Sequence, residues 1–270
     1  MNAFDPRLPL IAAQAKGFIL SAQDSLFGQR DVIGFGDDSF CVREIDRDRA
    51  NAIIVRNHYG KKIVNTAYIH LGVFLDGELY GVLQFGHAMN PKSGDSIIPG
   101  TGVYDFCELN RMWLDDFAPH CSESRAMSCA IKFIRRKYPK IKWIQSFADE
   151  RCGKFGAVYQ ASGFRYYGEH IGRFIELDGV VYHDQILTNG KKANTPSGSL
   201  LRANAERLNR FTLRQFRYLY FMQPRFAKAV KLKEQKFPKP DAAPQGEKSA
   251  PTDARQVQSL RAAPVLQAAS

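Results

Sequence analysis

The sequence predicts an α/β fold, with a mixed, mostly antiparallel sheet flanked by helices. Two observations indicate this class. Apolar runs of strand length recur between residues 39 and 184, and two pairs of them flank an Asp-Gly turn, which is a strong hairpin signal. Between them stand segments whose apolar residues recur with the period of a helix. Because hairpins and helical crossovers alternate, the sheet combines antiparallel and parallel neighbours.

The first half of this region reads strand, helix, hairpin, strand. Asp46 is an N-cap for the helix, and Asp76-Gly77-Glu78 forms the hairpin turn. A stretch rich in Gly, Pro and Ser then predicts a mobile loop. The predicted elements are a strand at 39–45, a helix at 46–56, hairpin strands at 71–75 and 79–85, the loop at 88–103 and a strand at 104–114.

The second half begins with the clearest helix of the chain. Ser122 is its N-cap, an apolar stripe at i, i+3, i+4 and i+7 starts at Met127, and Pro139 ends it. Gly163 closes a shorter helix, and Asp178-Gly179 turns a last hairpin. The predicted elements are helices at 122–138 and 155–162 and strands at 141–148, 164–168, 173–177 and 180–183.

The ends of the chain differ from this region. Residues 8–27 could form a helix, and residues 200–235 look largely helical. The last thirty residues contain no aromatic residue and are rich in Ala, Pro, Gln and Ser, which predicts disorder. The sequence therefore divides into an N-terminal arm at 1–38, an α/β domain at 39–190, a basic helical extension at 191–240 and a disordered tail at 241–270.

Positive charge is concentrated in one block. Residues 1–190 hold 22 basic and 22 acidic residues, whereas residues 191–240 hold 13 basic residues against two acidic ones. Such a block, interleaved with aromatic residues, favours double-stranded DNA as a partner, and the alternative is a solvated linker. On a helix, the arginines would line one face and contact phosphates. The candidate DNA-binding residues are Arg207, Arg210, Arg214, Arg217, Lys228 and Lys231.

Few features of the sequence bear on the cellular location of the protein or on its oligomeric state. The five cysteines are odd in number and irregularly spaced, which argues against a disulfide framework and favours a cytoplasmic location. No apolar run approaches the length that crosses a bilayer, so we expect no membrane association. Whether the chain forms a homodimer is left open.

The turn between the strand at 104–114 and the helix at 122–138 is a candidate anion site. Free N–H groups and the dipole at a helix N-terminus attract phosphate, although most such turns bind nothing. Neither a dinucleotide-binding nor a P-loop glycine motif is present. Ser122 and Ser124 could donate hydrogen bonds to a phosphate-bearing ligand here, and the alternative is a capping role.

The order of elements resembles the GNAT acyltransferases, which bind acetyl-coenzyme A. Residues 73–82 (VFLDGELYGV) resemble their central hairpin, and residues 108–114 (ELNRMWL) resemble the strand beside the pantetheine. Residues 157–164 (AVYQASGF) resemble their closing helix–strand element. The turn that holds the pyrophosphate usually contains glycines, whereas residues 118–125 here read APHCSESR.

Within that superfamily, the chain resembles the Mom DNA-modification proteins of Mu-like phages. The motifs are ELNR, the Ser-rich helix start, SFAD at 146–149, GAVYQASGFRYYGEH at 156–170 and His58-Tyr59. The resemblance implies conversion of adenine in DNA to an N6-carbamoylmethyl derivative that protects phage DNA from restriction. It also implies acetyl-CoA as donor and bound iron.

Several side chains are candidates for this chemistry. His58 and Asp149 could take part in an iron site with Tyr59, because imidazole, carboxylate and phenolate can all ligate iron. Glu108 could act as general base, and Tyr159 is implied to protonate the coenzyme A thiolate. The alternatives are a helix-end histidine, an N-capping Asp149, a buried Glu108–Arg pair and a core tyrosine. The candidate donor-binding residues are Arg111, Met112, Trp113, Leu114, Ser122, Ser124 and Arg125.

Three functions follow from these observations. The first is a phage-type DNA modification enzyme that converts the N6 amine of adenine to a carbamoylmethyl form and so protects the DNA from restriction. The second is an N-acetyltransferase acting on a protein or a small molecule. The third is a non-catalytic DNA-binding protein built on a GNAT-like fold.

Overall fold

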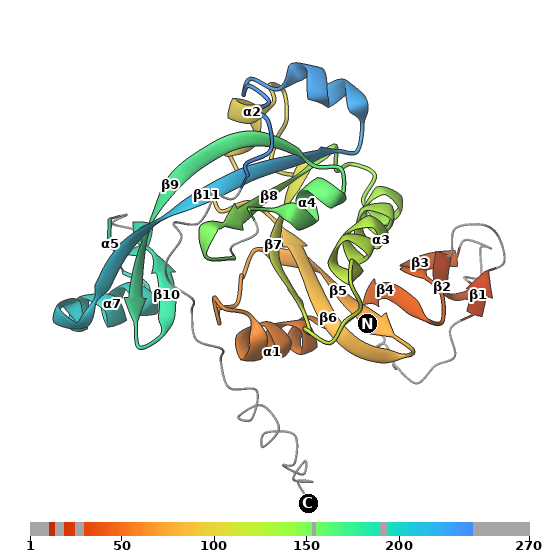
Figure 1. Ribbon diagram of the computed structural model, residues 1–270, viewed down its shortest axis with the longest axis horizontal. Coiled ribbons are helices and arrows are strands. Elements are labelled where there is room, and N and C mark those ends of the chain that lie inside the picture. The colour runs from red at the N-terminus through yellow and green to blue at the C-terminus, as the bar shows by residue number, and fades with distance from the viewer. Residues whose placement is uncertain (1–10, 14–18, 25–29, 153–154, 189–193, 240–270) are drawn as a thin grey trace, which may run out of the picture. The chain divides into compact units, whose positions relative to one another are not determined.

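The described strands form one sheet around which the rest of the protein is built (Figure 1). The computed structural model describes residues 11–13, 19–24, 30–152, 155–188 and 194–239. Their strands follow the order β1-β2-β3-β4-β5-β6-β7-β8-β11-β9-β10. The strands are β1 (Ile11–Ala13), β2 (Ile19–Asp24), β3 (Arg30–Gly36), β4 (Phe40–Glu44), β5 (Ala67–Leu75), β6 (Glu78–Gly86), β7 (Phe106–Leu114), β8 (Trp143–Asp149), β9 (Arg165–Leu177), β10 (Val180–His183) and β11 (Asn209–Phe221).

Neighbouring strands in this sheet are antiparallel, with β7 and β8 as the parallel pair among the described residues. The crossover between those two strands is helix α3, because a parallel connection must cross the sheet. The helices are α1 (Arg47–Asn57), α2 (Ser93–Ile97), α3 (Ser122–Lys137), α4 (Ala157–Ala161), α5 (Gln185–Thr188) and α7 (Pro196–Ala203), with 3-10 turns η1 (Glu150–Cys152), η2 (Ala205–Arg207) and η3 (Pro224–Ala229). The predicted mixed, mostly antiparallel sheet with flanking helices is confirmed.

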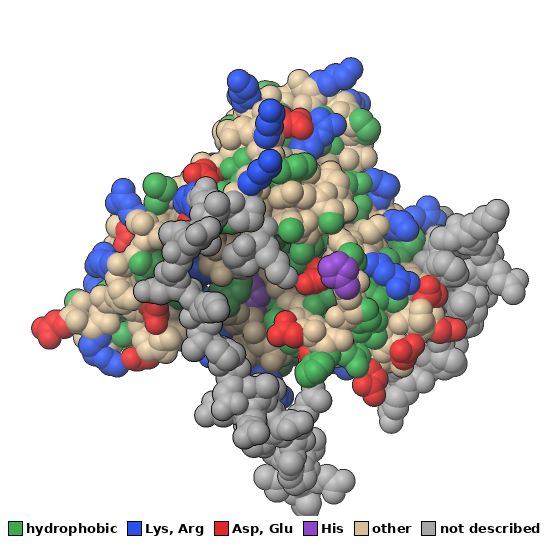
Figure 2. Space-filling view, viewed as in Figure 1, with side chains coloured by type: hydrophobic (Ala, Val, Ile, Leu, Met, Phe, Trp, Pro, Cys, Tyr) green, Lys and Arg blue, Asp and Glu red, His purple; other side chains and the backbone are tan. Residues whose placement is uncertain are grey.

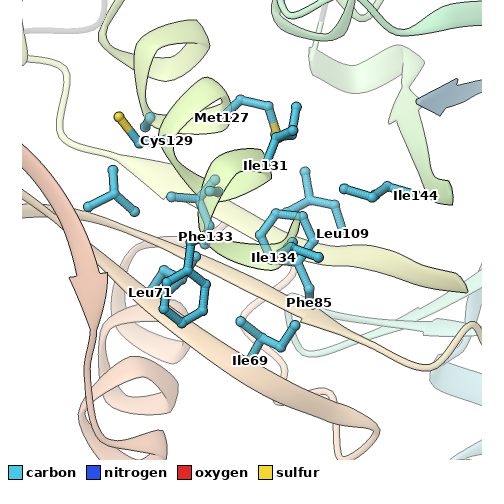
Figure 3. Close-up of a cluster of buried hydrophobic side chains, with 14 of the residues drawn as sticks. Ile69, Leu71, Phe85, Leu109, Met127, Cys129, Ile131, Phe133, Ile134 and Ile144 are labelled. Atoms are coloured by element: carbon cyan, nitrogen blue, oxygen red, sulfur yellow. The ribbon is translucent and has the colours of Figure 1, made fainter. Parts of the chain in front are cut away.

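The main hydrophobic core lies between α3 and one face of the sheet (Figure 3). Met127, Ile131 and Ile134 of the helix meet Leu109 and Ile144 of the central strands. The apolar stripe that predicted this helix is therefore the stripe that it buries, and its basic C-terminal turn suits the helix dipole.

The opposite face of the sheet carries smaller clusters. Ala50 and Ile54 of α1 pack on Val82 of β6. Further along the sheet, Ile97 and the adjacent Ile98 pack with Trp143, whose ring stacks on Phe106 at 4.3 Å between ring centroids. The loop predicted at 88–103 thus contains α2 and buried side chains, because these isoleucines cover apolar strand residues.

Two helical predictions are wrong. Residues 209–221, inside the predicted helical extension, form strand β11, which pairs with β8 on one side and β9 on the other. Phe216 and Tyr218 of this strand are fully buried, so pairing and burial override the helical spacing of the arginines. Among the described residues of this extension, helical structure is limited to α7, η2 and η3.

In the N-terminal arm, the helix predicted at 8–27 is replaced by β1 and β2 where the chain is described. These two strands pair with each other, and β2 continues the sheet to β3. The strands predicted at 164–168 and 173–177 are one continuous strand, β9. The predicted tail at 241–270 lies outside the described residues.

Candidate functional site

The parallel strands β7 and β8 separate from each other in the middle of the sheet. They pair at three positions only, ending at Glu108 and Gln145, although β7 continues to Leu114 and β8 to Asp149. The pairing of β6 with β7 shifts register between Gln84 and Phe85, which leaves Asn110 as an extra residue. Such a bulge bends a strand, and here it comes where the β7–β8 ladder ends.

A cavity of about 160 Å³ lies where the two strands separate, and we call it the strand-split cavity. It brings together six residues singled out by the sequence, from four separate segments of the chain. These are His58, Tyr59, Arg111, Met112, Asp149 and Tyr159. The remaining lining residues are Leu109, Asn110, Phe147, Ala148, Gly156, Ala157 and Val158.

His58 is held in one tautomer at this cavity. It is the C-cap residue of α1, and its side chain is only 5% exposed. The Gly60 backbone N–H donates to His58 Nδ1 at 2.9 Å, so the neutral ring carries its proton on Nε2. Burial, reinforced by Arg111 and Arg151, lowers the pKa of His58 to about 3. The imidazole is therefore neutral at physiological pH, with Nε2–H as a donor.

Asp149 is held by an arginine that the sequence analysis did not single out. Arg151 donates from Nη2 to Oδ2 of Asp149 at 2.6 Å and from Nε to Oδ1 at 3.0 Å. Its backbone N–H also donates to Oδ1, so the capping role weighed for Asp149 is present too. The sequence did contain a signal for this ion pair: two opposite charges stand two residues apart at the end of a buried strand.

The same guanidinium reaches the other side of the cavity. Its Cζ lies 4.9 Å from the centre of the Tyr59 ring, which in turn stacks on the His58 ring at 4.2 Å. Tyr59 is 50% exposed, so one of the aromatic side chains of the cavity faces solvent. A cation over an aromatic ring is an attractive arrangement.

This arrangement does not fit the iron site that the resemblance implies. Among the described residues, no group of three or more His, Cys, Asp or Glu side chains is gathered as metal ligands. A ligating histidine usually donates its second ring N–H, whereas His58 accepts at Nδ1. Both oxygens of Asp149 accept hydrogen bonds from the Arg151 guanidinium, whose positive charge would lie beside any bound cation.

Glu108 lies beside the strand-split cavity, at the last paired position of β7. Gln145 Nε2 donates to its carboxylate at 2.9 Å, and Asn110 also hydrogen-bonds to it. Burial raises the pKa of Glu108 to about 7, although these hydrogen bonds, Arg111 and Arg217 oppose the shift. A carboxyl group with that pKa can take up or release a proton near neutral pH.

Tyr159 packs in the core and also lines the strand-split cavity. It comes from α4, which follows Gly156, a residue at φ +83° whose absent Cβ would lie 2.4 Å from the Tyr218 ring. The Tyr159 ring packs at 5.3 Å from Tyr218 and 5.5 Å from Phe164.

A second cavity, of about 490 Å³, lies at the start of α3, and we call it the α3 cavity. Ser122, Ser124 and Arg125 line it, as do Ala161 and Ser162 from the end of α4. Both cavities thus border α4. Arg125 lies 4.2 Å from the centre of the Phe40 ring and pairs with Asp37 at 3.4 Å.

The capping role predicted for Ser122 is wrong, because the helix begins at Ser122 and Cys121 is its N-cap. Cys121 adopts φ +67° and makes no side-chain capping hydrogen bond. The first turn of α3 thus begins at the α3 cavity without a side-chain cap. Such a helix start offers backbone N–H groups to an anion.

Two of the predicted donor-binding residues are placed elsewhere. Trp113 and Leu114 line neither cavity. Trp113 packs against the α1 cluster on the opposite face of the sheet, and Leu114 packs against the main core. Arg111 and Met112 directly follow the bulge at Asn110, where β7 leaves β8, whereas Trp113 and Leu114 lie further along β7.

The predicted helical arginine face does not form, because Arg210, Arg214 and Arg217 belong to strand β11. Arg207 pairs with Asp178, Arg210 with Asp184 at 3.3 Å, and Arg214 with Glu150 at 2.9 Å. Arg217 is half-buried with its guanidinium over the Phe147 ring, and the negative charge of Glu108 favours its charged form. Lys228 and Lys231, in contrast, are exposed.

No helix in the described part of the chain is long and apolar enough to span a membrane.

Fold and cavities define an α/β protein whose sheet opens between two parallel strands, with an uncapped helix start nearby. The chain belongs to the Mom protein family, whose model matches residues 39–239. It is 43% identical over 233 residues to methylcarbamoylase mom of Escherichia phage Mu, covering 86% of this chain and 96% of that protein. The predicted family is thereby confirmed.

Solved acetyltransferase structures are also similar, at low sequence identity. One, from Salmonella typhimurium, modifies the N-terminal serine of ribosomal protein L7/L12; it is 14% identical, with a TM-score of 0.42, covering 69% of this chain and 97% of its own. An aminoglycoside acetyltransferase in complex with coenzyme A and kanamycin is 11% identical, with a TM-score of 0.41, covering 68% and 96%.

Proposed function

We propose that this protein is an enzyme that modifies the N6 amine of adenine in phage DNA, with acetyl-coenzyme A as donor. The observation that carries the proposal is a joint one. A relative named methylcarbamoylase is 43% identical over nearly its whole length, and six residues singled out for this chemistry share one cavity. Action in the host cytoplasm, where phage DNA resides, is part of the proposal.

The α3 cavity would take the phosphates of the donor. The uncapped start of α3 offers backbone N–H groups to these phosphates. Arg125 lines the same cavity, but its charge is shared with Asp37. The pantetheine would then run along α4 toward the strand-split cavity, since α4 borders both. There Arg111 and Met112 of β7 would lie beside its reactive end.

The acceptor base must leave the duplex to reach such a cavity, because the reacting amine is paired within the stack. Its rim offers the half-exposed Tyr59 ring, on which an extruded base could stack. Glu108 would receive the proton that the amine loses as its new bond forms. Tyr159 would give a proton to the thiolate that leaves the donor.

The product distinguishes this reaction from ordinary acetyl transfer. Acetylation places an acyl carbon on N6, whereas a carbamoylmethyl group is joined through its methylene carbon and contains one more nitrogen and one more hydrogen. The two products therefore have different masses. Forming the carbamoylmethyl group from an acetyl group also requires two co-reactants besides acetyl-CoA: a nitrogen donor that displaces the thiolate at the acyl carbon, and a two-electron oxidant that allows the N6–C bond to replace a methyl C–H bond. Which donor atoms become the methylene carbon and the amide is decided by isotope-labelled acetyl-CoA, since only labelled atoms that are transferred appear in the nucleoside.

The test is mass spectrometry of nucleosides from cells that express the protein, with the Tyr159→Phe variant as matched control. We expect a carbamoylmethyl deoxyadenosine that is depleted in the control, and plasmid DNA from the same cells should resist restriction enzymes. Unmodified DNA together with acetylated protein or small amines would replace the proposal with an ordinary N-acetyltransferase. Unmodified DNA with tight DNA binding would indicate a non-catalytic binding protein.

A further inference from the structure

The last described segment, residues 225–239, carries a run of exposed positive charge, and we call it the strap. Six of its residues are basic and one is acidic. Figure 2 shows Lys and Arg side chains gathered at the top of the view, where Figure 1 has α2, η3 and the segment after it. The basic residues are all exposed: Arg225, Lys228, Lys231, Lys233, Lys236 and Lys239.

These charges are not cancelled by neighbours. Within the described residues none of the six forms an ion pair, and the acidic residue of the strap, Glu234, is paired with Arg165 of β9 at 3.2 Å. The arginines of β11 and η2 differ, because Arg207, Arg210 and Arg214 each face a carboxylate. An arginine already paired with a carboxylate adds little to the potential that attracts a polyanion.

The strap is fastened to the sheet along its length. The backbone N–H of Lys231 donates to Ile97 O, at the end of α2, and that of Gln235 donates to Tyr166 O of β9. Further on, the Phe237 ring stacks on Tyr218 at 6.4 Å. The lysines are thereby carried on a backbone of fixed course, unlike those of a free tail.

The course of the strap ends beside the proposed catalytic site. Tyr218, on which Phe237 stacks, donates its hydroxyl proton to Phe155 O. Its ring also touches the position of Gly156, which lines the strand-split cavity. The row of lysines therefore starts near α2 and leads toward the loop that walls this cavity.

The geometry points to the strap as the surface that binds the phosphate backbone of duplex DNA and guides it to the strand-split cavity. The arginines of β11 and η2 are not part of that surface. This inference rests on the proposed function, because DNA is taken as the substrate. The contacts are to phosphates, so the surface adds affinity and orientation without sequence preference.

A charge-matched pair of variants tests the assignment in the full chain. Lys228→Gln/Lys231→Gln and Arg207→Gln/Arg210→Gln each remove two positive charges, one pair from the strap and the other from residues paired with carboxylates. Binding to a short duplex without donor is measured between about 50 and about 200 mM salt. Each lost phosphate contact lowers the salt slope by about 0.9, so we expect a loss of about 1.8 in the strap variant and little change in the arginine variant.

Equal losses in the two variants, or a larger loss in the arginine variant, would overturn the inference. Thermal melting of both proteins separates binding from misfolding, and Lys233→Gln/Lys236→Gln provides a second strap variant if the first unfolds. Nucleoside analysis of DNA from cells that express the wild-type protein separates a failure of the strap inference from a failure of the proposed function. Strap-dependent binding without a modified nucleoside contradicts the proposed function alone, whereas modification with an unchanged strap slope contradicts the strap alone.

Discussion

Arg151 holds Asp149 through both of its carboxylate oxygens, at 2.6 and 3.0 Å, at the point where β8 ends. The same guanidinium lies over Tyr59, which follows α1 nearly a hundred residues earlier in the sequence. Arg151 therefore connects two segments that supply the strand-split cavity with its polar residues. Removing it should affect the stability and the shape of the cavity together.

We expect Arg151→Met to destabilise the protein by about 1–3 kcal/mol, because the Asp149 side chain is only 6% exposed and would lose its charged partner. Urea unfolding measures the change. The double variant Asp149→Asn/Arg151→Met should recover part of the loss, since no uncompensated charge remains. If the two single substitutions simply add in the double variant, the two side chains are not coupled.

Glu108→Gln tests the carboxyl group whose pKa burial raises from 4.5 to about 7. If it accepts the proton of the amine, kcat/KM of the wild-type protein rises with pH up to about 7, and the Gln variant loses most of its activity at every pH. Activity that persists in Glu108→Gln with an unchanged pH profile would assign the proton to another group.

The same pKa has a consequence for stability. Because the folded-state pKa of Glu108 is raised, the folded protein binds more protons than the unfolded chain between pH 4.5 and about 7, and stability falls as pH rises through that window. The loss is at most about 3 kcal/mol. We expect unfolding measured from pH 4 to 8 to show a smaller decline in Glu108→Gln than in the wild-type protein.

His58 gives the opposite sign. Its pKa is lowered to about 3, so the unfolded chain takes up a proton that the folded protein does not, and stability is lost as pH falls below 6.5. We expect the ring resonances of His58 in NMR spectra to show no titration between pH 5 and pH 8. Titration near pH 6.5 would mean that the ring is not buried between Arg111 and Arg151 as described.

Local signals explain which parts of the fold the sequence predicted. Helix α3 follows from one apolar stripe, and the β5–β6 hairpin follows from Asp76-Gly77, so neither depends on distant residues. Strand β11 depends on two distant strands, β8 and β9, which leave a gap between them that it fills. The spacing of the arginines matched a helix, and no local feature of the sequence indicated the gap between β8 and β9.

The same difference between local signals and distant contacts decides how much of the site could be predicted. His58, Tyr59, Asp149 and Tyr159 could be singled out from the motifs of the resemblance, and they share a cavity. The partners that fix the chemistry of these residues could not be predicted from the sequence. The contact between Arg151 and Asp149 and the bulge at Asn110 depend on how side chains and strands pack in the folded protein. Trp113 and Leu114 were wrongly expected at the site, because the sequence does not show how far along β7 the cavity extends.

The interior position of β11 predicts that a chain ending at residue 199 does not fold. Without β11, β8 and β9 would each lose a neighbour, and the core would lose the buried Phe216 and Tyr218. We expect circular dichroism of the shortened protein to show no cooperative melting. A cooperative transition like that of the full chain would establish residues 1–199 as an independent domain.

Tyr159→Phe separates the hydroxyl of Tyr159 from its ring. The ring packs between Tyr218 and Phe164, and the substitution keeps those contacts, so the cost in stability should not exceed about 1–2 kcal/mol. If the hydroxyl protonates the leaving thiolate, activity should fall by about 10²–10⁴-fold, the usual contribution of general acid catalysis. Tyr159→Ala, the control, removes the ring as well and should also lower the melting temperature. Single-turnover modification of an adenine-containing duplex, with melting measured in parallel, decides the matter. A Phe variant that works within a few-fold of the wild-type rate would make Tyr159 a core residue, and another group would have to protonate the thiolate.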